Sequence, residues 1–390
     1  NIPEKIKEIF NKPINAENLQ GLCKNAKTAC ILVCDITRPV PNHLFIEHMI
    51  KEMHKAGIKL ENILIIIATG LHRPAPEKEI KEIIKSKWVL NNIKIVNHYA
   101  RDDNNHKKIG VTSKGNIIKL DKRFLDSDIK IATGLVEPHF MAGYSGGRKV
   151  LAPGITHAET ITTFHSARYM ENKYSTSCNL TSNPLHEDQL EIVKMIGDVY
   201  AVNCVIDENR KLSYINFGEI ISSHLKAVKY ISSYAKVKCG KEFSTIITSA
   251  AGAPLDSNFY QTIKGMVTPL SILKEGGDLI IVAECSEGLG SDEFITSQKN
   301  LLKVGLDKFL EQILNKKHAD IDEWQTEMEV KSLKKGNIYL YSEGLSNADK
   351  KLTGVNITNN LIKTVNESIE KHNNYNVAII PEGPYVIPVV

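Results

Sequence analysis

Three short segments in the first half of the chain carry side chains that could bind an anion or move a proton. The first reads Asp35-Ile36-Thr37-Arg38-Pro39-Val40-Pro41. The Asp35 carboxylate could accept hydrogen bonds from a ribose or from loop backbone, and the Arg38 guanidinium could grip a carboxylate or phosphate with two hydrogen bonds. A surface loop with a local Asp–Arg pair would contain the same residues, so both interpretations stay open for this segment.

The second segment reads Ala68-Thr69-Gly70-Leu71-His72-Arg73-Pro74. An imidazole at the tip of such a loop could accept and release a proton near neutral pH, because the unperturbed pKa of histidine lies close to it. We therefore take His72 as a candidate acid or base. The plainer interpretation is a solvated loop histidine with no chemical role.

The third segment runs from Thr133 to Lys149 and reads T-G-L-V-E-P-H-F-M-A-G-Y-S-G-G-R-K. Its glycines let backbone N–H groups approach a phosphate closely, and the Arg-Lys pair at its end adds positive charge. It is not a Walker loop, because Val150 follows the lysine where that motif requires Ser or Thr. Lys149 could instead hold a cofactor covalently. The glycines could equally serve only a tight turn.

His165 lies sixteen residues beyond Lys149, on a helix predicted to start near His157. Imidazole suits nickel, copper, zinc or iron, but one histidine without a second at helical spacing is an incomplete metal site. Other donors would have to come from outside the protein. The ordinary alternative is a His/Glu cluster that also uses His139, His157 and Glu159.

A further cluster opens the second half of the chain, with the sequence A-G-A-P-L-D-S-N-F-Y-Q-T-I-K-G. Asp256 or the serine after it is predicted to cap a helix over residues 257–266. Tyr260 and Lys264 are four residues apart on that helix, so they share a face, with Gln261 beside them. This face could bind a substrate, although a solvent-facing helix would look similar.

The elements that must position these residues alternate between Ile- and Val-rich runs and helical patterns, which is typical of an α/β fold with mostly parallel sheets. Strands are predicted at residues 29–34, 62–68, 93–97, 129–133 and 201–206, and in a second set at 245–248, 278–283, 337–341 and 376–380. Open α/β sheets bind ligands beyond the carboxyl ends of their strands. Segments 35–38, 69–73 and 134–149 are therefore expected to meet.

The length of 390 residues predicts two domains, each a mostly parallel sheet flanked by helices, with the active site in the cleft between them. The first domain is predicted to span 1–236 and the second 243–360, with the linker within 232–241. Residues 361–390 are expected to pack back on the first domain.

Composition excludes several classes of protein. Hydrophobic residues make up 42% and charged residues 24%, which is ordinary for a globular protein, and the net charge of +4 shows no basic stripe for a nucleic acid. No apolar run is long enough to span a membrane. Seven cysteines without a C-x-x-C pair favour reduced thiols and a cytoplasmic location. Because Asn1 is preceded by neither Met nor a signal segment, we expect the natural chain to begin earlier.

Taken together, the D-x-T-R-P-x-P loop, the T-G-x-H-R loop, the E-P-H-F…G-Y-S-G-G-R-K stretch, His165 and the Y-Q-x-x-K helix resemble the nickel-pincer-dependent lactate racemase family. The resemblance runs from about residue 30 to the closing P-E-G-P-Y-V at Pro381–Val386. Members of that family usually have a further N-terminal segment.

The resemblance implies a cofactor, Ni(II)-pyridinium-3,5-bisthiocarboxylate mononucleotide, which binds nickel through two sulfurs and a ring carbon. It implies that Lys149 is the covalent attachment point and His165 the protein's nickel ligand. Asp35, Ile36, Thr37 and Arg38 would border the cofactor. Separate enzymes would have to build and attach this group.

The resemblance further implies an isomerase that interconverts D- and L-lactate by reversible hydride transfer through bound pyruvate. His72 and His139 would be the acid/base pair, one for each face of the flat ketone. Arg38, Gln261 and Lys264 would hold the substrate, and Tyr260 would line the pocket. We expect no nucleic-acid or membrane partner.

Three alternatives stay open at this point. Relatives within the family act on other 2-hydroxy acids, including malate and longer aliphatic or aromatic acids. A PLP-type racemase or lyase could use Lys149 as its Schiff base. A non-catalytic carboxylate-binding protein could use Arg38 and Lys264 merely to clamp an anion.

Overall fold

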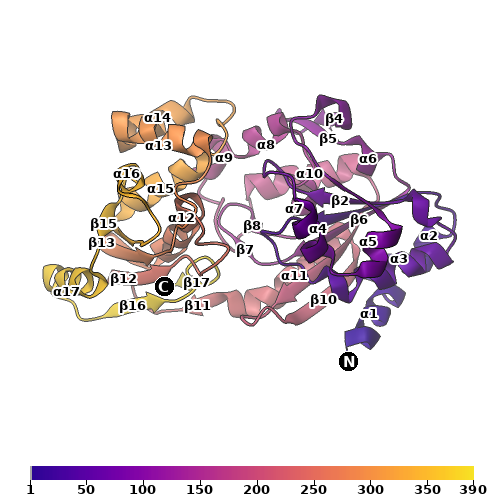
Figure 1. Cartoon of the computed structure of the whole chain (residues 1–390), viewed down its shortest axis with the longest axis horizontal. Helices are drawn as coiled ribbons and strands as arrows, with labels where there is room; N and C mark the ends of the chain where they lie inside the picture. Colours follow the sequence, from indigo (N-terminus) through magenta and orange to yellow (C-terminus); the bar gives the residue numbers. More distant parts are fainter. Residues whose placement is uncertain (1) are drawn as a thin grey trace. The chain divides into compact units, whose positions relative to one another are not determined.

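The computed structural model describes residues 2–390 and divides into two compact α/β units (Figure 1). Unit 1 comprises residues 2–164 and 178–233, and unit 2 comprises residues 165–177 and 234–390. The predicted fold class is confirmed, since each unit contains a mostly parallel sheet flanked by helices.

Unit 1 is built on a six-stranded sheet with the strand order β10-β9-β6-β1-β2-β3. All neighbours pair in parallel except β10, which runs antiparallel to β9 at one edge. The chain adds β2 and β3 on one side of β1, then β6 and β9 on the other, so the topological switch point lies between β1 and β6. The strands are β1 (Ala29–Cys34), β2 (Ile63–Ala68), β3 (Lys94–Asn97), β6 (Ile129–Leu135), β9 (Tyr200–Ile206) and β10 (Leu212–Glu219).

The central strands of this sheet are continuous apolar runs because helices cover both faces. Ile31 and Val33 of β1 pack with Ile65 and Ile67 of β2 in one core, and all four side chains are completely buried. Such runs are what made these strands recognisable in the sequence.

Helices and small hairpins complete unit 1. Its helices are α1 (Ile2–Asn11), α2 (Leu19–Cys23), α3 (Ile46–Lys55), α4 (Glu77–Ile84), α5 (Lys87–Asn92), α6 (Lys122–Leu125), α7 (Arg148–Leu151), α8 (Ala158–Phe164), α10 (Pro184–Ile196) and α11 (Ile220–Ala235), with 3-10 turns at Asn42–Leu44, Leu60–Asn62 and Asp103–Asn105. Its hairpins pair β4 (His106–Val111) with β5 (Ile117–Asp121), and β7 (Pro138–His139) with β8 (Gly143–Tyr144).

Unit 2 is built on a five-stranded parallel sheet with the order β15-β14-β13-β12-β16. Its switch point lies between β12 and β16, and α12 leaves the carboxyl end of β12 there. The strands are β12 (Phe243–Ser249), β13 (Leu273–Val282), β14 (Asn337–Tyr341), β15 (Asn356–Thr358) and β16 (Val377–Ile380). The helices are α9 (Ala167–Met170), α12 (Phe259–Val267), α13 (Asp292–Val304), α14 (Leu306–Leu314), α15 (Glu323–Lys335), α16 (Asn347–Lys350) and α17 (Leu361–His372), with a 3-10 turn at Thr268–Ser271.

The division differs from the predicted one at the end of the chain. Residues 361–390 belong to unit 2, because β16 pairs with β12 and α17 packs against β12 and β13. The stretch predicted as a linker, 232–241, contains the end of α11 and the strand β11 (Lys236–Lys238). This strand pairs in parallel with β17 (Ile387–Val389).

The division also differs at residues 165–177, which were predicted within the first domain and belong to unit 2. The reason is packing: Ala167 of α9 is buried in a cluster with Phe309 and Val330 of unit 2. Lys331 of α15 also donates a 2.5 Å hydrogen bond to the Met170 carbonyl. The periodicity of strands and helices in the sequence does not indicate that a short segment packs in the other unit.

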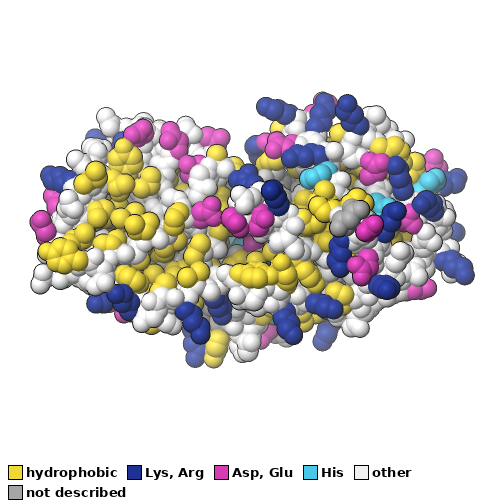
Figure 2. Space-filling view, turned by 90° about the horizontal axis from the view of Figure 1, so that it is seen from below, with side chains coloured by type: hydrophobic (Ala, Val, Ile, Leu, Met, Phe, Trp, Pro, Cys, Tyr) yellow, Lys and Arg dark blue, Asp and Glu magenta, His cyan; other side chains and the backbone are white. Residues whose placement is uncertain are grey.

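Lys and Arg side chains are interspersed with Asp and Glu on the face drawn in Figure 2, and no stripe of one sign runs across it. Among residues 2–390, no helix combines the length and the hydropathy that a membrane crossing requires.

Candidate active site

The first contacts at the switch point of unit 1 join the loops after β1 and β2. Asp35 follows β1, and one of its carboxylate oxygens lies 2.6 Å from Nδ1 of His72, which follows β2. The other oxygen accepts hydrogen bonds from the hydroxyl of Thr37 at 2.5 Å and from its backbone N–H at 3.1 Å. Segments 35–38 and 69–73 therefore meet, as the strand order requires.

This geometry sets the protonation of both groups. Burial acts to raise the pKa of the Asp35 carboxyl, but the hydrogen bonds from His72 and Thr37 outweigh it, so the net pKa is lowered. An ionised Asp35 fixes the proton of neutral His72 on Nδ1. The Nε2 lone pair, on a side chain that is half exposed, is then available as a base.

Arg38 pairs with a different acid from the one the sequence suggested. Its guanidinium donates to Glu137, in the loop after β6, rather than to Asp35. The contact joins segment 35–38 to segment 134–149, so all three predicted segments meet. The E-P-H motif contains Glu137, but the sequence predicted no role for it, because its partner Arg38 lies in the loop after a different strand, β1.

The hydrogen bonds of His139 favour the tautomer opposite to that of His72. Its Nδ1 accepts hydrogen bonds from the backbone N–H groups of Met141 at 3.3 Å and Ala142 at 3.1 Å. The lone pair of Nδ1 is thereby occupied, so neutral His139 carries its proton on Nε2. Its ring also stacks on Phe140, with centroids 4.7 Å apart.

The glycine-rich turn before Lys149 is tightly packed. Gly146 and Gly147 have φ of +72° and +47°, which favours glycine. A Cβ on Gly147 would lie 2.8 Å from the His224 side chain, and one on Gly146 would lie 2.6 Å from Val136. This turn ends at α7, which carries Lys149, half-buried, as its second residue.

Arg148, beside Lys149, is a buried cation that pins the turn. Its Nε donates to Nδ1 of His186 at 2.9 Å, and its two terminal nitrogens donate to the carbonyls of Tyr144 and Ala142 at 3.0 Å. Burial lowers the pKa of Arg148 to about 9 and that of His186 to about 3. The sequence did not reveal this role of Arg148, because its two histidine partners are distant along the chain. His186 lies on α10 and His224 on α11.

A pair of histidines lies behind the His72 loop. The Thr69 hydroxyl donates to the His98 carbonyl at 2.8 Å, and Nε2 of His98 lies 3.0 Å from Nε2 of His106. Burial, together with the neighbouring His106, lowers the pKa of His98 to about 3. His98 is thus a neutral structural support for the loop.

His165 lies in the turn between α8 and α9 rather than within a helix, because Ser166 has extended backbone and starts α9. Its half-buried ring packs on Trp324 of unit 2, with centroids 4.6 Å apart and planes tilted by 43°. Trp324 donates its indole N–H to the Tyr260 hydroxyl at 3.0 Å. Two residues predicted from separate motifs are thus joined by a third that the sequence did not single out.

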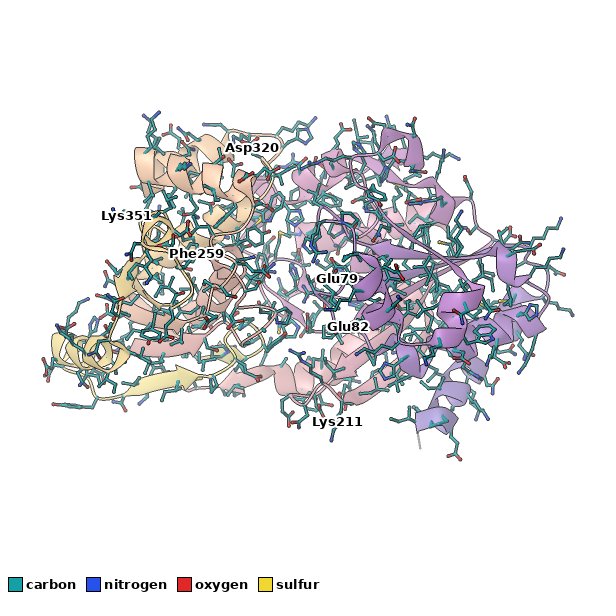
Figure 3. The ribbon with its side chains drawn as sticks, viewed as in Figure 1. Glu79, Glu82, Lys211, Phe259, Asp320 and Lys351 are labelled. Atoms are coloured by element: carbon teal, nitrogen blue, oxygen red, sulfur yellow. The ribbon has the colours of Figure 1, made fainter. Side chains whose placement is uncertain are left out.

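The helix predicted at 257–266 is α12, which begins at Phe259 (Figure 3). Its cap is Asn258, whose side chain accepts from the Gln261 N–H at 3.0 Å; the predicted caps, Asp256 and Ser257, lie in the preceding turn. Lys264 donates to the Gln261 side chain at 2.5 Å, so these two residues share a face as predicted.

The alternative His/Glu cluster is not assembled. Nε2 of His157 faces Asp103 at 3.3 Å, and Glu159 pairs with Lys119 at 2.7 Å. Across residues 2–390, no group of three or more His, Cys, Asp and Glu side chains is arranged to hold a metal ion.

Known proteins match both units. Residues 2–177 match the family description "Lactate racemase N-terminal domain" and residues 240–388 match "Lactate racemase C-terminal domain". A lactate racemase of Lactiplantibacillus plantarum is 30% identical over 98% of this chain and 90% of the relative. One of Thermoanaerobacterium thermosaccharolyticum is 35% identical over 74% of this chain and 67% of the relative.

Two solved structures have the same fold as this chain. The lactate racemase apoprotein from Thermoanaerobacterium thermosaccharolyticum superposes with a TM-score of 0.93 at 30% identity, covering 100% of this chain and 93% of that one. A Thermotoga maritima protein at 16% identity, with a TM-score of 0.73 over 99% of this chain and 97% of that one, shares the fold. The predicted family and the predicted enzyme class, a racemase, are confirmed: the chain belongs to the lactate racemase family.

Proposed function

We propose that this protein is a lactate racemase that interconverts D- and L-lactate and depends on the nickel-pincer nucleotide. The names of the relatives support the substrate. The observation that carries the proposal is the meeting of His72, Arg38 and the segment 134–149 at the switch point of unit 1. A base and a carboxylate-binding cation belong together where α/β sheets bind ligands.

The residues fit such a cofactor. The turn at Gly146 and Gly147 has no room for a Cβ and presents Lys149 at the start of α7, as a covalent attachment point beside a nucleotide requires. His165 offers one imidazole, a donor that suits nickel. A cofactor that brings its own sulfur and carbon donors needs only one ligand of this kind from the protein.

When bound, the pyridinium ring of the nucleotide would supply a reversible acceptor for the hydrogen on the carbon beside the carboxylate. We propose that Lys149 carries this group through a covalent bond and that His165 completes the ligand set of the nickel. Asp35 to Arg38 would border it.

The protein's own contribution to the chemistry is to hold and move protons. His72 is set to accept the hydroxyl proton of lactate at Nε2, because Asp35 holds its Nδ1–H and stabilises the imidazolium that forms. A positioned base of this kind is typically worth about 10²–10⁴-fold in rate.

His139 would serve the opposite face of the substrate but begins from another state. With Nδ1 occupied by two backbone N–H groups, it presents an Nε2–H that can donate a hydrogen bond. To accept a proton at Nε2 it must give up those two hydrogen bonds. The two histidines are therefore unequal partners in the two directions of the reaction.

Substrate binding would rest on charge and on the polar face of α12. Arg38 has five N–H donors and can grip a carboxylate while it keeps its contact with Glu137. Lys264 and Gln261, already joined by a hydrogen bond, would hold the remaining oxygens, and Tyr260 would line the pocket. A small monocarboxylate such as lactate suits this set.

The location and partners of the enzyme follow from the same proposal. None of the seven cysteines, all of them within the described residues, forms a disulfide, which favours the reducing cytoplasm. The enzymes that build and attach the cofactor would be its partners.

The test is racemisation by protein produced together with those enzymes, compared with His72→Ala and His139→Ala. The proposal expects each variant to lose turnover by about 10²-fold or more while still binding lactate. Turnover of malate or a longer 2-hydroxy acid but not of lactate would move the substrate within the family. Unchanged lactate affinity with no turnover by any form, including the fully loaded parent, would favour a carboxylate-binding protein.

A further inference from the structure

The Trp324 side chain contacts both His165 and Tyr260. It lies in the first turn of α15 and is 6% exposed. Its ring packs against the His165 imidazole, with centroids 4.6 Å apart, and its indole N–H donates to the Tyr260 hydroxyl at 3.0 Å. All three residues belong to unit 2, so this contact is fixed within one compact body.

The backbone around Trp324 is held in place. Asp322, two residues earlier, starts α15 with φ of +63°, a conformation that L-residues adopt only at a cost. The Ser291 hydroxyl donates to its carboxylate at 2.5 Å. The indole is therefore presented by a constrained turn rather than by a freely adjusting helix end.

The Tyr260 hydroxyl is fixed from both sides. It accepts the Trp324 N–H and donates to the Asp322 carboxylate. Its ring also packs edge-on against Phe294, with centroids 5.3 Å apart. Burial, with the charge of Asp322, raises the pKa of Tyr260 well above its ordinary value, so the phenol stays neutral and keeps both hydrogen bonds.

His165 gains its orientation from the same indole. It stands in the turn between α8 and α9, and Ala167, two residues later, anchors the backbone in the core of unit 2. An imidazole that ligates a metal must keep its ring nitrogen aimed at the ion. Residues that orient such ligands typically change metal affinity by 10–100-fold when replaced.

We infer that Trp324 is a positioning residue that sets the imidazole of His165 through its ring and the phenol of Tyr260 through its N–H. The inference rests on the proposed function for the roles of those two residues. The ring and the N–H of the indole thus have separate tasks, and Trp324→Phe, which keeps a ring but has no N–H, can separate them.

The first experiment needs no cofactor. Trp88 and Trp324 are the two tryptophans of the chain, so Trp88→Phe leaves Trp324 as the single reporter in the apoprotein. At one fixed pH, adding His165→Ala should shift its emission to longer wavelength, because water reaches the uncovered ring face. Adding Tyr260→Phe should shift it to shorter wavelength, because the N–H loses its acceptor. Unchanged emission in both variants would overturn the inference.

The second experiment uses the protein produced with its cofactor-building enzymes. Trp324→Phe keeps an aromatic ring beside His165 but has no N–H, so nickel content should stay near that of the parent while KM for lactate rises about fivefold, the worth of one hydrogen bond. Trp324→Leu lacks both features and should also lose nickel affinity by about 10–100-fold. Equal nickel retention in the two variants, or an unchanged KM in Trp324→Phe, would contradict the inference.

A folding control separates these effects from general instability. Leu340→Ala removes a fully buried side chain from β14 and should lower the melting temperature without the nickel loss of Trp324→Leu. If Leu340→Ala loses nickel to the same extent, the effect of Trp324 is structural only. If the parent protein itself holds no nickel, the proposed function fails, whereas the emission shifts of the apoprotein still decide the contacts of Trp324.

Discussion

The Asp35 carboxylate lies 2.6 Å from Nδ1 of His72, whereas Nδ1 of His139 faces two backbone N–H groups. One imidazole therefore offers a lone pair at Nε2, and the other offers an N–H at the same atom. Because we propose these two histidines as the acid/base pair of a racemase, which must serve both faces of its substrate, we expect this difference to have measurable consequences.

Asp35→Asn should lower kcat by about 10²–10⁴-fold with little change in stability. The amide can no longer hold the Nδ1–H tautomer of His72 or stabilise the imidazolium, and loss of the carboxylate partner of a catalytic histidine has effects of that size. The measurement is racemisation with cofactor content determined in parallel. Asp126→Asn, at an exposed position of the same unit, is the matched control and should keep full activity. Equal rates in the two variants would remove Asp35 from the mechanism.

The pH dependence of kcat should differ between the D-to-L and L-to-D directions. In the proposed mechanism each direction starts with a different histidine as the base. Nδ1 of His72 faces the Asp35 carboxylate, whereas Nδ1 of His139 faces two backbone N–H groups. Initial rates of both directions, measured from pH 5 to 9, would test this. Superimposable profiles for kcat would show that the two histidines reach equivalent states during turnover.

Gly147→Ala should destabilise unit 1 and reduce attachment of the cofactor at Lys149. The new Cβ would lie 2.8 Å from the His224 side chain at a φ of +47°. Gly115→Ala is the matched control, since its φ is +80° but nothing lies within 4 Å of the new Cβ. Both substitutions place an alanine at a positive φ, which strains the backbone, and only Gly147→Ala adds a clash. Equal melting temperatures for the two would show that the turn adjusts without cost.

Glu329→Gln should stabilise unit 2 increasingly as the pH rises. Glu329 is fully buried and accepts a 2.5 Å hydrogen bond from Gln298, and burial raises its pKa well above the ordinary value. A raised pKa means that the stabilisation is complete below the unfolded pKa of about 4.3 and is lost as the pH rises through the folded value. The amide avoids that loss.

Thermal melting at pH 5, 6.5 and 8 should therefore show a growing advantage of Glu329→Gln over the parent, each pKa unit being worth about 1.4 kcal/mol. Glu311→Gln, at an exposed position on α14 of the same unit, should show no such trend. A constant difference between Glu329→Gln and the parent across this range would contradict a raised pKa for Glu329 in the folded protein.

The strands that build both central sheets could be predicted because their burial on both faces leaves continuous Ile and Val runs. Strand β1 was predicted at its observed bounds, and so was β14. The hairpin of β4 and β5 escaped prediction, because exposed residues such as Lys107 and Lys108 leave no apolar pattern. Edge strand β10 begins with half-exposed and exposed residues and was missed for the same reason.

The candidate site could be predicted as far as it depends on loops at strand ends. Asp35, Arg38, His72 and segment 134–149 were expected to meet from topology alone, and the contacts of Asp35 and Arg38 confirm this meeting. The individual side-chain pairs could not be predicted, since Arg38 pairs with Glu137 rather than with Asp35, which is closer in sequence.

Residues that act through long-range contacts gave no local signal. Arg148 is held by side chains from α10 and α11, and Trp324 reaches His165 and Tyr260 across more than one element of unit 2. Each looks in the sequence like an ordinary helix residue. Their roles follow from tertiary packing, which neither spacing nor composition records.

Covalent attachment of the cofactor at Lys149 is what the proposed mechanism requires. Intact mass and nickel content of the protein produced with the cofactor-building enzymes, compared with those of Lys149→Ala and followed by a D/L-lactate assay, test it. We predict added mass, bound nickel and racemisation in the parent and none of the three in the variant. An unmodified mass for the parent, or added mass that persists in Lys149→Ala, would contradict it.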